Sequence, residues 1–103
     1  SFLYIDECIE GTLRVMRSNY SSPVNIGSDE MVSINQLVSI VASAAKKTIH
    51  INNIPGPVGV AGRNSDNRLI HQELDWKPSW LLSDGIALTY KWIEEQVAIA
   101  AQK

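Results

Sequence analysis

The amino-acid sequence predicts a small α/β domain with about four helices and two or three short strands. Apolar residues recur at helical spacing in several stretches, which is typical of amphipathic helices. Between these stretches lie short apolar and β-branched runs bounded by glycine, proline or polar residues, as expected for strands. Three short strands are few for a freestanding sheet, so the expected sheet is minimal.

The N-terminal quarter of the chain predicts a strand, a helix and a second strand. Residues 2–5 form a β-prone apolar run, and Asp6 then suits a helix N-cap because its carboxylate can accept from free backbone N–H groups. The expected helix covers about residues 7–17. A polar loop leads to the second strand at residues 23–27, which ends at a glycine. The apolar positions of the helix are Ile9, Leu13 and Met16.

The next segment predicts a helix that begins with Ser33 as its N-cap. Lys46 and Lys47 fall at its C-terminal end, where positive charge suits the helix dipole. Residues 49–54 alternate loosely and predict a third strand. The expected buried stripe of the helix consists of Ile34, Leu37, Val38, Val41 and Ala45.

The C-terminal half predicts a long loop and two further helices. Residues 55–65 contain three glycines and two prolines and are read as loop. Asp66 is expected to cap a short helix that ends near Leu74, and Asp84 to cap the last helix. The tail after residue 97 has little to bury and is expected to fray. The inner face of the last helix is expected to carry Ile86, Tyr90, Ile93 and Val97.

Size and composition predict one soluble globular domain over residues 1–103. Apolar residues make up 45% of the chain and charged residues 19%, and the net charge is -2. The basic residues are scattered, which argues against a nucleic-acid partner. No apolar run approaches the roughly 20 residues of a membrane span, and no leader pattern is seen. A single cysteine allows no internal disulfide, so we expect a reduced, cytoplasmic setting.

Residue types that could perform catalysis are present, but they do not form a recognisable set. His50 and His71 lie far apart in the sequence, without cysteines or carboxylates at metal-ligand spacing. Cys8 in a first helical turn is most simply a small hydrophobe, and the capping role of Asp6 explains the Asp6-Glu7 pair. The chain also has no glycine-rich dinucleotide fingerprint. We therefore predict no catalytic residue and no metal site.

The loop around Arg63 is the best candidate for a binding site. An arginine guanidinium donates two parallel hydrogen bonds to a phosphate, and a glycine such as Gly62 lets the backbone approach a ligand. Asn64 and Ser65 add neutral donors, although the Asp66 carboxylate competes for the helix N–H groups that follow. These residues fit a phosphate or diphosphate site and a solvated surface turn equally well.

Several motifs together resemble a known family. The segments "YIDE", "NIGS", "LDWKP" and the "GI" helix are similar to the C-terminal part of an extended short-chain dehydrogenase/reductase. This superfamily contains the NAD-dependent nucleotide-sugar epimerases and dehydratases. The segments "VNIGSDEMVS" and "GRNSDN" look most like the epimerases that act on GDP-mannose. The resemblance covers nearly the whole chain and implies a substrate-binding portion without its Rossmann body.

The resemblance implies roles for particular residues. Ser65 and Arg63 would face the diphosphate of a nucleotide sugar, and Gly62 and Asn64 would shape that loop. Residues 25–27 would belong to a strand that completes the cofactor-domain sheet. The chain departs from the family in two ways that remove positive charge. A phosphate-binding arginine of the family would lie before Ser1, and another would stand where this chain has Ala61.

The resemblance also implies what this chain does not do alone. In the family, NAD binds to the N-terminal domain, which also carries the catalytic Tyr-x-x-x-Lys pair, and neither feature occurs here. We therefore expect a substrate-binding C-terminal domain that binds no cofactor alone, is inactive alone and binds a nucleotide sugar weakly. We also expect a homo-oligomer, because strand edges and apolar helix faces would be left uncovered. The alternative is a non-enzymatic interaction or oligomerisation module derived from the same fold.

Overall fold

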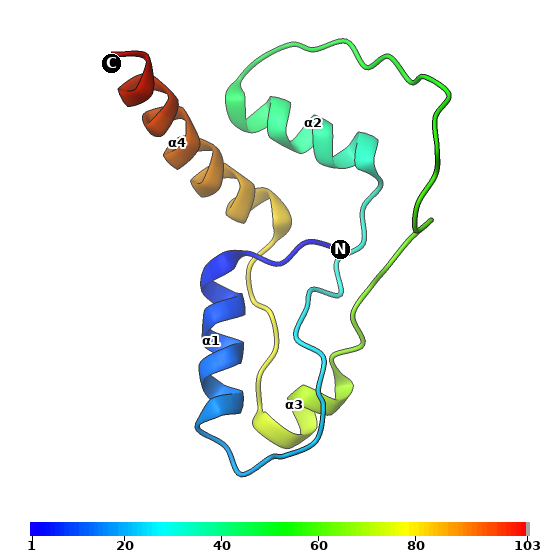
Figure 1. Ribbon diagram of the computed structural model, residues 1–103, viewed down its shortest axis with the longest axis vertical. Helices are drawn as coiled ribbons and strands as arrows, with labels where there is room; N and C mark the ends of the chain where they lie inside the picture. The colour runs from blue at the N-terminus through cyan, green and yellow to red at the C-terminus, as the bar shows by residue number, and fades with distance from the viewer. Residues whose placement is uncertain (103) are drawn as a thin grey trace. The chain divides into compact units, whose positions relative to one another are not determined.

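The computed structural model describes residues 1–102, and its regular structure is helical (Figure 1). None of the described residues belongs to a strand, so the expected α/β class is wrong. Helices and coil make up the fold instead. The helices are α1 (Ile5–Met16), α2 (Ile34–Ala45), α3 (Arg68–Leu74) and α4 (Leu82–Ala101).

The chain forms two compact units, and each unit combines two separate stretches of sequence. Unit 1 consists of Ser1–Met31 and Pro57–Trp80 and contains α1 and α3. Unit 2 consists of Val32–Gly56 and the chain from Leu81 onward, and it contains α2 and α4. The single domain expected over residues 1–103 stays a prediction.

The three expected strands are extended or irregular coil. Residues 2–4 lead directly into α1, and residues 23–27 and 49–54 form no ladder with any described segment. A strand exists only when a neighbouring backbone satisfies its N–H and C=O groups. Near residues 23–27, the Gly27 carbonyl instead accepts a hydrogen bond from the Asn67 side chain. A short apolar run is compatible with both outcomes, so the sequence pattern alone was misleading.

Helix α1 begins earlier than the sequence suggested. Tyr4 occupies the N-cap position and makes no side-chain cap, so the expected capping role of Asp6 is wrong. Asp6 and Glu7 lie in the first turn, where negative charge suits the helix dipole. Gly11 is buried, and a Cβ there would lie 3.1 Å from Trp76 Cε2, so glycine permits a close approach of α1 to Trp76.

The core of unit 1 is small and centred on Ile70 and Trp76. Ile70 in α3 is fully buried, and Trp76 is 2% exposed. Burying an aliphatic side chain of this size contributes roughly 1.5–3 kcal/mol. The Trp80 ring packs against Tyr4, with 4.8 Å between the ring centroids. These contacts hold the segment after α3 against the start of α1.

A buried carboxylate reinforces the same connection. Glu7 is only 5% exposed, and its Oε1 accepts hydrogen bonds from the backbone N–H and hydroxyl of Ser79 and from the Trp80 N–H. Buried charge is tolerated only where donors of this kind satisfy it. Sequence analysis did not single out this role of Glu7, since the partners lie more than 70 positions away.

Two features mark the C-terminal end of the short helix α3: hydrogen bonds to its last carbonyl groups and a left-handed C-cap residue. Arg14 Nη1 donates to the carbonyl oxygens of Leu74 at 3.2 Å and Asp75 at 2.9 Å. Asp75 adopts the left-handed conformation at the C-cap, with φ of 51°. The expected end near Leu74 is confirmed. Asn67 rather than Asp66 is the N-cap residue, although Asp66 accepts a hydrogen bond from the Arg68 N–H.

Helix α2 of unit 2 confirms the expected cap at Ser33. The Ser33 hydroxyl accepts from the Gln36 N–H, and the Gln36 side chain accepts from the Ser33 N–H, which is a complete capping box. The helix ends at Lys46, which is left-handed with φ of 54°. The expected buried stripe is only half-buried, and Ile34 at its start is 66% exposed.

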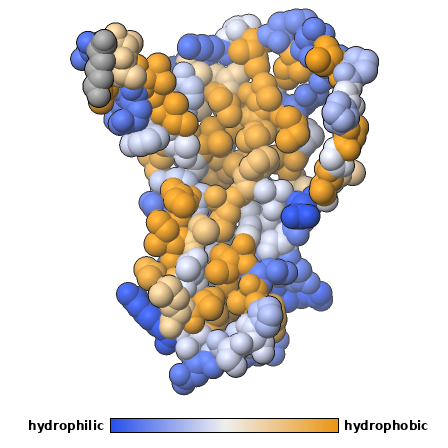
Figure 2. Space-filling view, viewed as in Figure 1, coloured by the Kyte–Doolittle hydropathy of each residue, from blue (hydrophilic) through white to orange (hydrophobic). Residues whose placement is uncertain are grey.

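Helix α4 packs against α2 within unit 2. Its N-cap is Leu81, so the expected capping role of Asp84 is wrong, and Asp84 lies in the first turn. Ile86 and Tyr90 are half-buried, whereas Ile93 and Val97 of the expected inner face are exposed. The helix continues to Ala101 instead of fraying after residue 97. Figure 2 shows hydrophobic side chains gathered over α2 and along α4.

Within residues 1–102, no helix combines the length and apolar character needed to cross a membrane.

Candidate functional site

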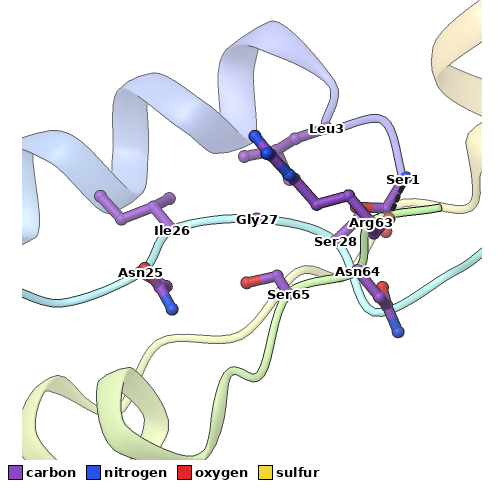
Figure 3. A pocket seen from close by; sticks show the side chains of 9 residues that line it. All are labelled: Ser1, Leu3, Asn25, Ile26, Gly27, Ser28, Arg63, Asn64 and Ser65. Atoms are coloured by element: carbon purple, nitrogen blue, oxygen red, sulfur yellow. Dashed lines mark hydrogen bonds between the residues drawn. The ribbon is translucent and has the colours of Figure 1, made fainter. Parts of the chain in front are cut away.

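Unit 1 contains an open cavity of about 490 Å³ between two coil segments (Figure 3). One wall is formed by residues 25–28 and the other by residues 63–65. Both segments are coil, so no helical or strand periodicity in the sequence indicates the cavity. The lining residues are Ser1, Leu3, Asn25, Ile26, Gly27, Ser28, Arg63, Asn64 and Ser65.

Asn67 ties the two walls together. Its Nδ2 donates to the Gly27 carbonyl at 2.9 Å, and its Oδ1 accepts from the Ser65 hydroxyl at 2.7 Å. The Ser65 N–H also donates to the Ser28 carbonyl, at 3.4 Å. Asn67 and Gly27 are 40 positions apart in the chain. This Asn67 bracket fixes the position of the Arg63–Ser65 segment.

Glycine is required where the walls meet. A Cβ on Gly27 would lie 2.6 Å from Ser65 Cβ, a distance that real Cβ atoms do not show. A Cβ on Gly62 would lie 2.7 Å from the terminal methyl of Met31, which is a flexible side-chain end. Gly27 therefore permits the close approach of residues 25–28 to Ser65.

Arg63 supplies the positive side chain of the cavity. Its side chain is exposed, and the guanidinium forms no hydrogen bond or ion pair with any of residues 1–102. The Arg63 carbonyl accepts a hydrogen bond from the Ser1 backbone nitrogen at 2.8 Å, which holds its backbone. In Figure 3 the Arg63 side chain runs beside Leu3, whereas Asn64 points the other way. No carboxylate is among the lining residues, so the cavity favours an anion.

The nearby carboxylate of Asp66 is occupied by a different arginine. Arg68 Nη2 lies 2.6 Å from Asp66 Oδ2, and Arg68 Nε also donates to this carboxylate. These hydrogen bonds lower the pKa of Asp66 from 3.8 to about 2 and raise the pKa of Arg68. Both residues line a neighbouring cavity of about 470 Å³ rather than the Arg63 cavity.

The structure brings most of the sequence-predicted site residues together. Arg63, Asn64 and Ser65 line the cavity, while Gly62 precedes them and packs beside Met31. Residues 25–27, expected in a cofactor-domain strand, form the opposite wall as coil. Sequence reasoning missed Asn67, which ends the same "GRNSDN" segment, because its backbone partner Gly27 is 40 positions away.

The residues considered for catalysis or metal binding are distributed over both units. His50 and His71 are exposed and lie in different units, and Cys8 is a half-buried free thiol. Among residues 1–102, no group of three or more His, Cys, Asp or Glu side chains is arranged to hold a metal ion. Ligand binding at the Arg63 cavity is therefore the chemistry that this arrangement supports best.

Comparison with known proteins gives a clear relationship. The chain is 54% identical over 97 residues to GDP-mannose 3,5-epimerase of Arabidopsis thaliana, which covers 94% of this chain and 26% of that protein. GDP-mannose 3,5-epimerase 1 of Oryza sativa subsp. indica matches equally well. UDP-glucuronic acid decarboxylase 1 of Danio rerio is 28% identical over 98 residues, or 94% of this chain and 23% of that protein. No family model matches the chain.

The resemblance to the C-terminal part of an extended short-chain dehydrogenase/reductase is confirmed. The chain spans about a quarter of the length of the curated relatives it matches. The names of these relatives refer to two nucleotide-linked sugars, GDP-mannose and UDP-glucuronic acid. The predicted binding roles of Arg63, Asn64, Ser65 and Gly62 stay predictions.

Proposed function

We propose that this chain is the substrate-binding part of a nucleotide-sugar epimerase that acts on GDP-mannose or a close relative. Arg63 contacts the diphosphate, Asn64 and Ser65 complete the same side of the site, and Gly62 lets the loop turn past Met31. The proposal rests on one observation: a cationic cavity whose guanidinium is unpaired within residues 1–102, in a chain 54% identical to part of a GDP-mannose epimerase.

The expected affinity of the chain by itself is weak. One charge-assisted arginine contact contributes about 1.5–3 kcal/mol, whereas a millimolar dissociation constant corresponds to about 4 kcal/mol. The base and the sugar must supply the remainder from a cavity that is open to solvent. We therefore expect GDP to bind with a dissociation constant in the millimolar range or somewhat below.

Chemical-shift titration with GDP tests this function. In the wild-type chain the largest shifts should fall on residues 25–28 and 62–67, and Arg63→Ala should abolish them while leaving the rest of the spectrum unchanged. Arg17→Ala is a matched control, because Arg17 is also exposed but lines a different cavity. Shifts that cluster elsewhere, or that persist in Arg63→Ala, would show that Arg63 is an ordinary surface residue.

We also propose that NAD acts in the full-length parent enzyme through residues outside this chain, and that the parent enzyme works in the cytoplasm. Calorimetric titration of the chain with NAD should give no heat of specific binding. A micromolar dissociation constant would overturn this part of the proposal.

The second candidate function is an interaction or oligomerisation module. It is favoured by the number of large apolar side chains that are exposed, including Ile34 in α2 and Trp92 and Val97 in α4. Exposed apolar surface marks association sites in soluble proteins where it gathers into large patches. We propose that the chain self-associates, and light scattering across a range of concentrations should give a mass above that of the monomer. If the measured mass stays that of a monomer at high concentration while GDP binds, only the substrate-binding function is supported.

A further inference from the structure

The direction of each hydrogen bond in the Asn67 bracket is fixed by chemistry. The Gly27 carbonyl can only accept, so the Asn67 amide must turn its NH₂ group toward Gly27. Its oxygen then faces Ser65, and an amide oxygen can only accept. The Ser65 hydroxyl must therefore donate its proton to Asn67.

This arrangement determines what Ser65 can offer a ligand. A serine hydroxyl has one O–H, and here Asn67 receives it, so Ser65 Oγ retains only acceptor capacity toward the cavity. The oxygens of a diphosphate at neutral pH are themselves acceptors. A phosphate oxygen at Ser65 would thus meet a second acceptor, whereas a hydroxyl group would meet a matching partner.

The backbone and Cβ of Ser65 are held in place, so Ser65 Oγ stays beside Asn67. Ser65 is half-buried, its backbone N–H is bonded to Ser28, and its side chain lies close against Gly27. The cation for the diphosphate is two residues earlier, at Arg63. Diphosphate and hydroxyl recognition are therefore assigned to neighbouring positions on one wall of the cavity.

Building on the proposed function, we propose that Asn67 is a positioning residue that fixes Ser65 as a hydrogen-bond acceptor for a hydroxyl group of the ligand. The hydroxyl belongs to the sugar or to the ribose of a nucleoside-diphosphate sugar, and the diphosphate lies on Arg63. This moves Ser65 from the diphosphate, where the family resemblance put it, to a ring that carries hydroxyls.

Three ligands separate these roles: inorganic pyrophosphate, GDP and GDP-mannose, each titrated by NMR. Arg63→Ala should weaken all three. Ser65→Ala should leave pyrophosphate within twofold of wild type and weaken hydroxyl-bearing ligands roughly 2- to 10-fold, the effect of losing one neutral hydrogen bond. Weaker binding of both GDP and GDP-mannose assigns the ribose, whereas weaker binding of GDP-mannose alone assigns the hexose.

Asn67→Ala frees the Ser65 hydroxyl to donate and also releases the Arg63–Ser65 segment, so it should weaken GDP-mannose more than it weakens pyrophosphate. This change in preference would not follow from a structural role alone. Ser21→Ala, at an exposed serine, is the control. If Ser65→Ala weakens pyrophosphate as much as GDP-mannose, the inference is wrong although the proposed function stands. If no ligand binds the wild-type chain, the proposed function fails and the inference with it.

Discussion

Unit 1 and unit 2 are stabilised in different ways. Unit 1 buries Ile70, Trp76 and the Glu7 carboxylate, and side chains such as Asn67 bond to backbone far away in the sequence. Unit 2 rests on the contact between α2 and α4, in which α2 contributes no fully buried residue.

The two units depend on two kinds of sequence information: polar side chains that bond over long distances, and local signals that form helices. Directional hydrogen bonds specify one arrangement of irregular backbone, and they build the Arg63 cavity of unit 1. Helical caps and apolar spacing specify helices without specifying a unique tertiary partner. Unit 2 accordingly has a larger share of its residues in helices than unit 1.

The largest expected effect is on the core of unit 1. Ile70→Ala removes a fully buried side chain and should lower the free energy of unfolding by about 2–5 kcal/mol. Leu69→Ala is the matched control in the same helix, because Leu69 is 41% exposed, and it should cost about 0.5 kcal/mol or less. Urea denaturation of both variants measures the difference. Equal losses would mean that Ile70 does not form the core.

The Glu7 carboxylate should show the next largest effect. Glu7→Gln removes the charge that three donor groups converge on and should cost about 1–3 kcal/mol of unfolding free energy. Glu10→Gln, in the same helix, breaks only an exposed pair with Arg14 and should cost about 0.5 kcal/mol or less. Thermal unfolding of the two variants provides the test, and a larger loss in Glu10→Gln would contradict the buried role of Glu7.

Among residues 1–102, each unit contains one non-glycine residue in the left-handed conformation, which allows a direct comparison. Lys46→Gly should stabilise the end of α2 by about 1 kcal/mol, because glycine adopts positive φ without strain. Asp75→Gly should give a smaller gain in unit 1, since aspartate tolerates this conformation better than lysine. Differential scanning calorimetry can rank the two. Destabilisation by Lys46→Gly would contradict the assigned backbone.

The smallest effect concerns the exposed Asp66–Arg68 pair. The folded pKa of Asp66 lies below its usual value, at about 2, because Arg68 donates hydrogen bonds to the carboxylate. The pair therefore stabilises the fold above about pH 4, and this contribution disappears as the pH falls toward 2. An NMR pH titration should place the Asp66 midpoint near 2. Arg68→Ala should return it toward 3.8, and Arg17→Ala should leave it unchanged.

Local features of the fold could be predicted from the sequence. The cap at Ser33, the end of α3 near Leu74 and the loop before Ser65 all follow from short-range preferences. The capping roles of Asp6 and Asp84 failed because both helices begin earlier, so these carboxylates lie in the first turn. Local preference places a helix more reliably than it places the first residue.

The remaining features depend on long-range contacts that no local pattern encodes. The segment at residues 23–27 is extended but unpaired with another strand, and its partner is the Asn67 side chain. Arg63, Asn64 and Ser65 could be named from residue types and from the family resemblance. The opposing wall of the cavity and the role of Asn67 could not be predicted, because both depend on contact between coil segments that are distant in the sequence.

The interleaving of the two units sets an order for folding during synthesis. Unit 1 is interrupted by Val32–Gly56, so Glu7 and Gly27 must wait for Trp80 and Asn67 to be translated before their contacts can form. Bringing these ends together requires loop closure across the intervening segment. Helix α2 is translated before unit 1 is complete, yet its partner α4 is translated only after unit 1. A nascent chain therefore exposes the apolar side of α2 until α4 has been translated.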